Sequence, residues 1–349
     1  MTTPDSHPRS DAPDATLNIG KLPGPLLDRL VDTYRTAFDP AVLVLPGYGR
    51  DAAAIDIGGA SPIIVKSDPI TFATDAATRY LVAVNSNDIA CLGGIPRWLS
   101  VVLLLPEKIR IRDVEAMFAD LQVACNDAGV SVIGGHTEVT PIVTRPVFIG
   151  TMLGVAGPRG VLVPGGAMAG DDLLLTKWIG IEGTALLARE RTGELTEALG
   201  AAVTARAAKL LRHPGIDISA DAQAVLEADG VTALHDPTEG GVATAIHELA
   251  SASGCGAEIL ASAMPVLPET TAICNHFGVD PLGLLSSGAL LVAVKPHQRS
   301  TVERSARERG IAIAHIGKMT DSNEGITMIG EEGRANLPRF DSDEVARVL

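Results

Sequence analysis

Short aliphatic runs alternate with segments of helical periodicity along most of this 349-residue chain, and a stretch rich in glycine and proline at 157–172 interrupts the alternation. Such alternation predicts an α/β (α+β) architecture in which helices cover sheets. An apolar content of 46% is sufficient for two buried cores. We therefore expect a flexible tail at 1–19, a first domain at 20–157, a second at 168–320 and a C-terminal extension at 321–349.

Local patterns predict the individual elements of both blocks. The predicted helices are Leu26–Ala37, Arg79–Ala90, Val114–Ala128, Glu182–Arg191, Ala220–Ala228 and Val242–Ser253. The predicted strands are Ala41–Leu45, Pro62–Lys66, Leu99–Leu105, Val130–Ile133, Val147–Val155, Leu173–Thr176 and Leu290–Val294, followed by the apolar segment Ile311–Ile316.

Charge and hydropathy exclude several classes of protein. The formal net charge is −14, and no dense cluster of Lys and Arg provides the attraction that nucleic acids or anionic membranes require. No apolar run reaches the roughly 18 residues needed to cross a bilayer. The first residues lack the basic start and apolar core of a signal peptide, and the four cysteines show no CxxC pairing. We expect a soluble cytoplasmic protein that binds neither nucleic acid nor membrane.

Acidic side chains follow several predicted elements of the first block. Asp51 follows a glycine-rich turn, Asp68 follows a strand, Asp88 lies in the stretch NSND, and Glu138 follows a double glycine. Carboxylates together with water and phosphate oxygens are the ligands that Mg²⁺ prefers. Each residue also has a structural interpretation, because an Asp before a helix commonly caps it.

Paired or closely spaced glycines allow the backbone to approach an anion and to present N–H groups to it. Together with the carboxylates they favour a site for a magnesium-bound nucleotide. The common nucleotide-binding motifs GxxxxGK[ST] and GxGxxG are absent from the sequence. The glycines concerned are Gly47, Gly49, Gly134, Gly135, Gly240 and Gly241.

Other polar residues have two open interpretations. Histidine is the side chain that ordinarily changes charge near neutral pH, so His136 could act as a base or ligand, or could simply face solvent. Asn85 and Asn87 could orient phosphate or metal-bound water, or could be surface or capping amides of a helix. Cys91 has no basic neighbour to activate its thiol, so packing is the better interpretation.

Several motifs, in this order, resemble the aminoimidazole ribonucleotide (AIR) synthetase superfamily, also called PurM-like, and within it the HypE-type hydrogenase maturation proteins. The resemblance covers about residues 20–316. It is carried by the stretches GYGRDAAAI, KSDPITFATD, NSNDIACLGGIPRWLS, GGHTEVT, LLLTKWIGIEGTALLARE, HDPTEGGVATAIHELA and CGAEI.

The resemblance implies a homodimer in which two N-terminal domains form a β-barrel, with ATP and Mg²⁺ bound in a cleft. It assigns metal binding to Asp51, Asp68 and Asp88, and catalysis to His136 and Glu138. It assigns cofactor binding to Gly47, Gly49, Lys66, Asn87, Gly134, Gly135, Thr137 and Asp236.

Some positions depart from the family's patterns. Glu138 stands where HypE proteins have lysine, Ser287 where they have glutamate, and His136 replaces an acid of the GGDT motif. Arg50 replaces the first acid of a motif found in thiamine-monophosphate kinases. The sequence ends in DSDEVARVL, without the terminal cysteine that carries the carbamoyl group in HypE proteins.

The resemblance therefore implies an Mg-ATP-dependent enzyme that phosphorylates an oxygen of a small-molecule substrate, followed by loss or displacement of phosphate. A small-molecule kinase of the thiamine-monophosphate kinase type is one alternative. An ATP-binding maturation or regulatory partner without turnover is another. In a further interpretation, the acidic residues are only structural caps.

Overall fold

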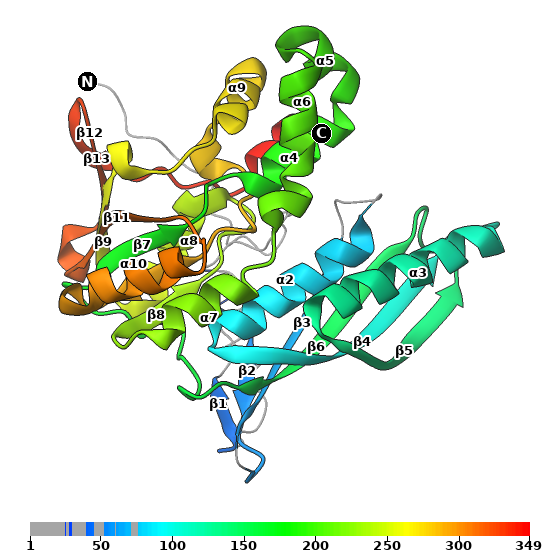
Figure 1. Cartoon of the computed structure of the whole chain (residues 1–349), viewed down its shortest axis with the longest axis horizontal. Coiled ribbons are helices and arrows are strands. Elements are labelled where there is room, and N and C mark those ends of the chain that lie inside the picture. Colours follow the sequence, from blue (N-terminus) through cyan, green and yellow to red (C-terminus); the bar gives the residue numbers. More distant parts are fainter. Residues whose placement is uncertain (1–24, 26–27, 30–39, 45–51, 60, 71–75) are drawn as a thin grey trace.

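Figure 1 shows the computed structural model, which describes residues 25, 28–29, 40–44, 52–59, 61–70 and 76–349. The helix predicted at Leu26–Ala37 and the predicted site residues Gly47, Gly49 and Asp51 lie outside this described part, apart from Asp28 and Arg29 of that helix. Among the described residues, no helix has the length and apolar character needed to cross a membrane.

In its described residues, the first domain is a six-stranded sheet with two helices on one face (Figure 1). The strand order is β1-β2-β3-β6-β4-β5, with β4 and β5 parallel and the other pairs antiparallel. The elements are β1 (Val42–Val44), β2 (Ala53–Ile55), β3 (Ile63–Ile70), α2 (Ala77–Cys91), β4 (Gly94–Leu105), α3 (Ile111–Ala128), β5 (Ser131–Val139) and β6 (Val147–Ala156).

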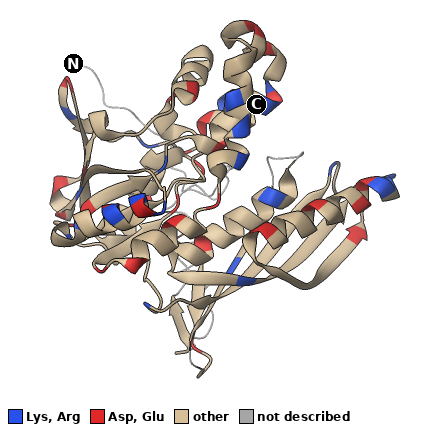
Figure 2. Ribbon diagram, in the orientation of Figure 1, with Lys and Arg blue, Asp and Glu red and all other residues tan. Residues whose placement is uncertain are grey.

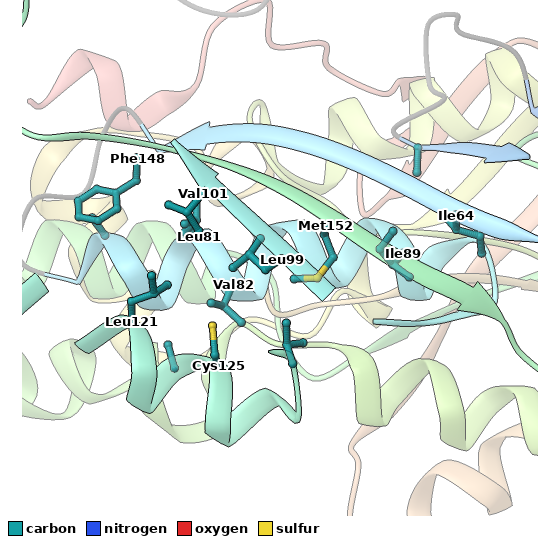
Figure 3. Close-up of a cluster of buried hydrophobic side chains, with 14 of the residues drawn as sticks. Ile64, Leu81, Val82, Ile89, Leu99, Val101, Leu121, Cys125, Phe148 and Met152 are labelled. Atoms are coloured by element: carbon teal, nitrogen blue, oxygen red, sulfur yellow. The ribbon is translucent and has the colours of Figure 1, made fainter. Parts of the chain in front are cut away.

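Buried and partly buried side chains alternate along the central strands, and the buried ones mark the sheet face that the helices cover. In β6, Phe148 and Met152 are buried while the intervening Ile149 and Leu153 are only partly buried. Figure 3 shows the buried set packed against α2 and α3, with Leu81 of α2 and Leu121 of α3 among its members. Because side chains on a strand point alternately to opposite faces, the second set lies on a face that no described helix covers.

The second domain is a seven-stranded mixed sheet in the order β13-β12-β9-β11-β7-β10-β8. Its strands are β7 (Asp172–Thr176), β8 (Val231–His235), β9 (Gly256–Leu260), β10 (Leu291–Val294), β11 (Ile313–Thr320), β12 (Ile326–Gly330) and β13 (Gly333–Asn336). The segment predicted as a C-terminal extension thus contributes β12 and β13.

Seven α-helices accompany this sheet among the described residues. They are α4 (Ile181–Glu190), α5 (Thr192–Leu199), α6 (Ala201–Lys209), α7 (Ser219–Glu227), α8 (Gly241–Ser253), α9 (Pro268–Phe277) and α10 (Arg299–Glu308). Shorter helical turns occur at Leu211–Gly215, Ala261–Ala263, Pro281–Gly283, Pro296–Gln298, Ser322–Glu324 and Glu344–Arg347.

Helix α2 belongs to both domains. Thirteen of its 15 residues are buried, so it has packing partners on nearly every side. Ala90 and Cys91 pack with Leu174 and Leu234 of the second sheet, and Tyr80 packs with Ile181 of α4. The helix predicted at Arg79–Ala90 is therefore confirmed, and it is the element through which the two domains share their cores.

The expectation that a strand ends at Ile133 is wrong. Strand β5 continues through the double glycine to Val139, and its parallel register with β4 shifts where Val132 pairs with Leu99 but Gly134 pairs with Ser100. The extra residue is a β-bulge. The double glycine therefore does not end the strand, and β5 remains paired with β4 through it.

Candidate active site

Lys66, Asp68 and Asp88 form a polar cluster between β3 and α2, which we call the junction cluster. Lys66 Nζ lies 2.8 Å from Asp88 Oδ2 and 3.6 Å from Asp68 Oδ2. Asp88 is buried, whereas Asp68 is partly exposed. The predicted strand end at Lys66 is also wrong, because β3 continues to Ile70 and Asp68 lies within it.

The sheet register explains why these three side chains meet. Lys66 pairs with Met152, which is buried on the helix-covered face, and Asp68 is two residues further along the same face. Asp68 pairs with Gly150, where an added Cβ would come within 2.9 Å of Asn85 Nδ2. Without a side chain at this position, α2 can lie close against the sheet and bring Asp88 to Lys66.

The composition of the junction cluster suits a magnesium-bound phosphate better than a metal held by protein ligands alone. Within the described residues, no group of three or more His, Cys, Asp or Glu side chains is arranged to hold a metal ion. Mg²⁺ is commonly bound through one or two carboxylates, with water and phosphate oxygens completing its shell. Asp68 and Asp88 could provide those carboxylates, and the Lys66 ammonium could neutralise a phosphate.

Asp236 approaches α2 from the second domain. It follows β8 and is buried, and the Cys91 thiol donates to its Oδ1 at 3.5 Å. Cys91 lies three residues beyond Asp88 on the same helix, so both face the same side of α2. The expectation that Cys91 is packed is confirmed, and its thiol contacts the predicted second-domain site residue.

Asn87 joins the two domains through both ends of its amide. Its Nδ2 donates to Ile216 O at 2.9 Å, and its Oδ1 accepts from Ile218 N at 3.0 Å. Asn85 is also buried and donates to Leu81 O within α2. The interpretation of these residues as surface or capping amides is therefore wrong, because α2 is enclosed by the second domain.

His136 and Glu138 lie on the edge strand β5, outside the junction cluster. Their side chains are 64% and 51% exposed, and His136 Nε2 is 3.3 Å from Glu138 Oε2. They pair with Val102 and Leu104, which belong to the sheet face away from α2 and α3. The two predicted catalytic residues are thus together, but on the opposite face from Lys66 and Asp68.

The predicted site residues of β5 are also separated from the junction cluster across the width of the sheet. Gly135, Val101, Gly150 and Asp68 form one row across β5, β4, β6 and β3. Three interstrand spacings correspond to about 14 Å. One chain therefore does not bring all the predicted site residues into one site.

The double glycine is used for backbone packing within one chain. A Cβ on Gly135 would come within 1.8 Å of Val101 O, whereas one on Gly134 would meet no atom within 4 Å. Thr137 lines a cavity of about 260 Å³ between α3 and β5, together with mainly apolar neighbours such as Met117, Phe118 and Val132. This apolar cavity does not include the junction cluster.

A second group of buried polar residues, which no sequence pattern indicated, lies where α2 meets α4. Glu182 and Tyr80 are buried there, and Ser287 donates a hydrogen bond to the Glu182 carboxyl. Tyr80 and Glu182 lie in predicted helices, and a helical pattern does not show which polar residues a second domain buries. The burial of α2 on nearly all sides was the missing information.

The two mixed sheets sharing helix α2, with carboxylates at their junction, define a two-domain α/β protein. Residues 49–156 match the N-terminal domain of AIR synthase related proteins, and residues 168–330 match their C-terminal domain. The chain belongs to the AIR synthase-related family.

Curated relatives span most of the chain. Carbamoyl dehydratase HypE of Cupriavidus necator is 30% identical over 324 residues, which cover 88% of this chain and 86% of the relative. Selenide, water dikinase of Photorhabdus laumondii is 27% identical, with 88% and 94% covered. A crystal structure of hydrogenase maturation protein HypE in complex with ATP matches the fold with a TM-score of 0.66 at 23% identity, covering 86% of this chain and 90% of that one.

Proposed function

We propose that this protein is an Mg-ATP-dependent enzyme that phosphorylates an oxygen of a small-molecule substrate, which then loses phosphate or has it displaced. The observation that carries the proposal is the junction cluster, in which two carboxylates from different elements converge on one ammonium group. The named relatives, a carbamoyl dehydratase and a selenide, water dikinase, and the ATP complex of a HypE protein support nucleotide chemistry.

Bound Mg-ATP would supply the phosphoryl group and the positive charge that offsets negative charge developing during transfer. Lys66, held between Asp68 and Asp88, would orient a phosphate oxygen. Asp68 is partly exposed and would accept the ion first, while the buried Asp88 would fix the position of Lys66. We extend the same proposal to Asp51, Gly47 and Gly49, which lie outside the described residues.

We further propose that the chain functions as a homodimer that covers the uncovered sheet face. That face carries partly buried apolar residues in register, including Val102 beside Ile149 and Leu153 beside Val65. A sheet face of this composition normally packs against another layer. His136 and Glu138 lie on the same face, so a second copy would change their exposure and could complete a site with them.

Two alternatives remain as proposals of lower rank. A kinase would leave the phosphate on its product, and the selenide, water dikinase relative favours this candidate. A maturation or regulatory partner would bind ATP without turnover, and the solved complex of a HypE with a HypF, which shares this fold, favours a partner role. The predicted roles of Gly134, Gly135 and Thr137 in nucleotide binding belong to the proposed dimer, because within one chain these residues pack against β4 and α3.

The test is a phosphate-release assay over a panel of small oxygen-containing substrates, with mass spectrometry of the products. Release that depends on both substrate and Mg²⁺, and that Asp88→Asn abolishes, supports the proposal. A product heavier by one phosphoryl group with no free phosphate identifies a kinase. ATP binding without turnover on any substrate would favour the regulatory alternative and count against the proposed enzyme.

A further inference from the structure

Glu182 and Tyr80 are polar groups from different domains that are buried against each other's elements. Tyr80 in α2 is 3% exposed, and Glu182 in the first turn of α4 is 7% exposed. Tyr80 packs in one apolar cluster with Ile181 and Ala185 of α4. The Glu182 carboxyl is close enough to raise the pKa of the Tyr80 hydroxyl electrostatically, after the larger effect of burial.

Each of these side chains presents a buried polar atom without a protein partner. Among the described residues, neither the Tyr80 hydroxyl nor Glu182 Oε2 makes a hydrogen bond. The Ser287 hydroxyl donates to the Glu182 carboxyl and is itself buried. A buried polar atom left without a partner destabilises the fold, so two such atoms on helices that pack together indicate a missing polar partner.

The electrostatic surroundings select the kind of partner. Burial is the largest cause that raises the pKa of Glu182 to about 8, and the nearby carboxylates of Asp343, Glu239 and Asp236 contribute to the same rise. Asp343 accepts hydrogen bonds from the backbone N–H groups of Gly240, Leu285 and Val345, so its position beside the contact is fixed. Negative charge on several sides disfavours a phosphate or carboxylate and favours a group that donates hydrogen bonds.

We propose that Glu182 and Tyr80 form a binding site for an N–H donor group of the substrate, an ammonium or amide nitrogen, at the contact between the two domains. A donor nitrogen placed there satisfies Glu182 Oε2 and the Tyr80 hydroxyl together. That the bound nitrogen belongs to a substrate rests on the proposed function, whereas the binding site itself does not. The nitrogen-bearing end would be bound here, while the junction cluster handles phosphate.

The test measures the melting temperature of the full-length protein at pH 8 without ATP, in ammonium chloride and in equal concentrations of potassium chloride or tetramethylammonium chloride. Tetramethylammonium has no N–H group, and potassium has the charge without the donor. We expect ammonium to raise the melting temperature by about 3 °C relative to both. Equal melting temperatures in all three salts would overturn the proposal.

Two variants localise the effect. Glu182→Gln and Tyr80→Phe keep the shape of each side chain, and each should abolish the ammonium-specific shift. Glu194→Gln on α5 is the matched control, because Glu194 is exposed and its ion pair is with His276, so the shift should remain. A shift that survives in both site variants would also overturn the proposal. Since no nucleotide is present, the result is independent of whether the protein binds or hydrolyses ATP.

Discussion

The junction cluster and the edge strand β5 carry the same kinds of residue in opposite environments. Lys66 and Asp88 are held 2.8 Å apart at the shared helix α2, on the face that helices cover. His136 and Glu138 are 3.3 Å apart on the uncovered face, with more than half of each side chain exposed. Figure 2 shows charged residues distributed widely over the ribbon, so charge alone does not distinguish the two regions.

Burial determines how much each charged pair contributes to the stability of the fold. An exposed ion pair is worth at most about 1 kcal/mol because water screens it, whereas a buried pair loses several kcal/mol when one partner is removed. The junction cluster is therefore a fixed feature of the monomer. The His136–Glu138 pair becomes comparably fixed only when something covers its face, and we propose that a second copy of the chain does so.

The largest effect is expected from Lys66→Met. The change leaves the buried Asp88 carboxylate without its ammonium partner and should lower the free energy of unfolding by about 4 kcal/mol. Urea denaturation measures this loss. The double variant Lys66→Met with Asp88→Asn should recover part of it, and no recovery would show that the pairing is not what stabilises this region.

Gly135→Ala should destabilise the edge strand by about 3 kcal/mol, because its Cβ would collide with Val101 O and its φ is +143°. Gly134→Ala is the matched control, with open space around the new methyl group and a φ of +147°. It should cost about 1 kcal/mol through backbone strain alone. Similar losses in thermal or urea unfolding for the two variants would contradict the bulged register of β5.

Stability should fall as the pH rises from 6.5 to 8.5. Glu182 has a pKa of about 8 in the folded protein against 4.5 ordinarily, so between these values the folded state binds more protons than the unfolded chain. This linkage removes about 2 kcal/mol over the interval. Glu182→Gln should abolish this loss and be more stable than the wild type at pH 8.5. The Asp343 pKa of about 6 lies below the interval, so a slope unchanged in Glu182→Gln would refute the assignment.

Asn87→Ala should lower the free energy of unfolding by about 2 kcal/mol, because the backbone groups of Ile216 and Ile218 each lose a partner. Asn85→Ala removes a hydrogen bond within α2 only and should cost about 1 kcal/mol. Hydrogen exchange should show faster exchange of the Ile218 amide in Asn87→Ala and little change in Asn85→Ala. The opposite order would mean that Asn87 does not join the domains.

The smallest effect on the monomer is expected from His136→Ala. Removing an exposed pair should change monomer stability by less than about 0.5 kcal/mol, which urea denaturation measures.

Sedimentation velocity tests the proposed dimer interface. A dimer formed through the uncovered face should be disrupted by Leu153→Asp, because Leu153 lies on that face. Glu308→Lys, on the exposed end of α10, should leave the dimer intact. A Leu153→Asp variant that sediments like the wild type would exclude that face as the interface.

Much of the fold follows from local patterns, whereas the arrangement of the site follows from tertiary contacts. The helix predicted at Arg79–Ala90 forms because its propensity and its packing agree. Local patterns also indicated Asp68 and Asp88 as acidic residues near element ends, and the family resemblance added Lys66. The structure places all three within elements and brings them together through the β3–β6 register and the missing side chain at Gly150, which single-sequence patterns do not contain.

The errors have a common physical origin. The double glycine at Gly134–Gly135 was interpreted by its backbone freedom, but the close approach to Val101 determines its conformation. One of the two interpretations of Asn85 and Asn87 placed them at the surface, although a second domain encloses the helix and bonds the Asn87 amide. In both cases long-range packing outweighed the local signal.

The most direct test of the junction cluster as a magnesium-nucleotide site is calorimetric titration with ATP, with and without Mg²⁺, on the wild type, Asp88→Asn and Glu308→Lys. Binding to the wild type that requires Mg²⁺, is lost in Asp88→Asn and remains in Glu308→Lys is the predicted result. Unchanged affinity in a folded Asp88→Asn would show that the buried carboxylates are structural, and the account of the site would be wrong.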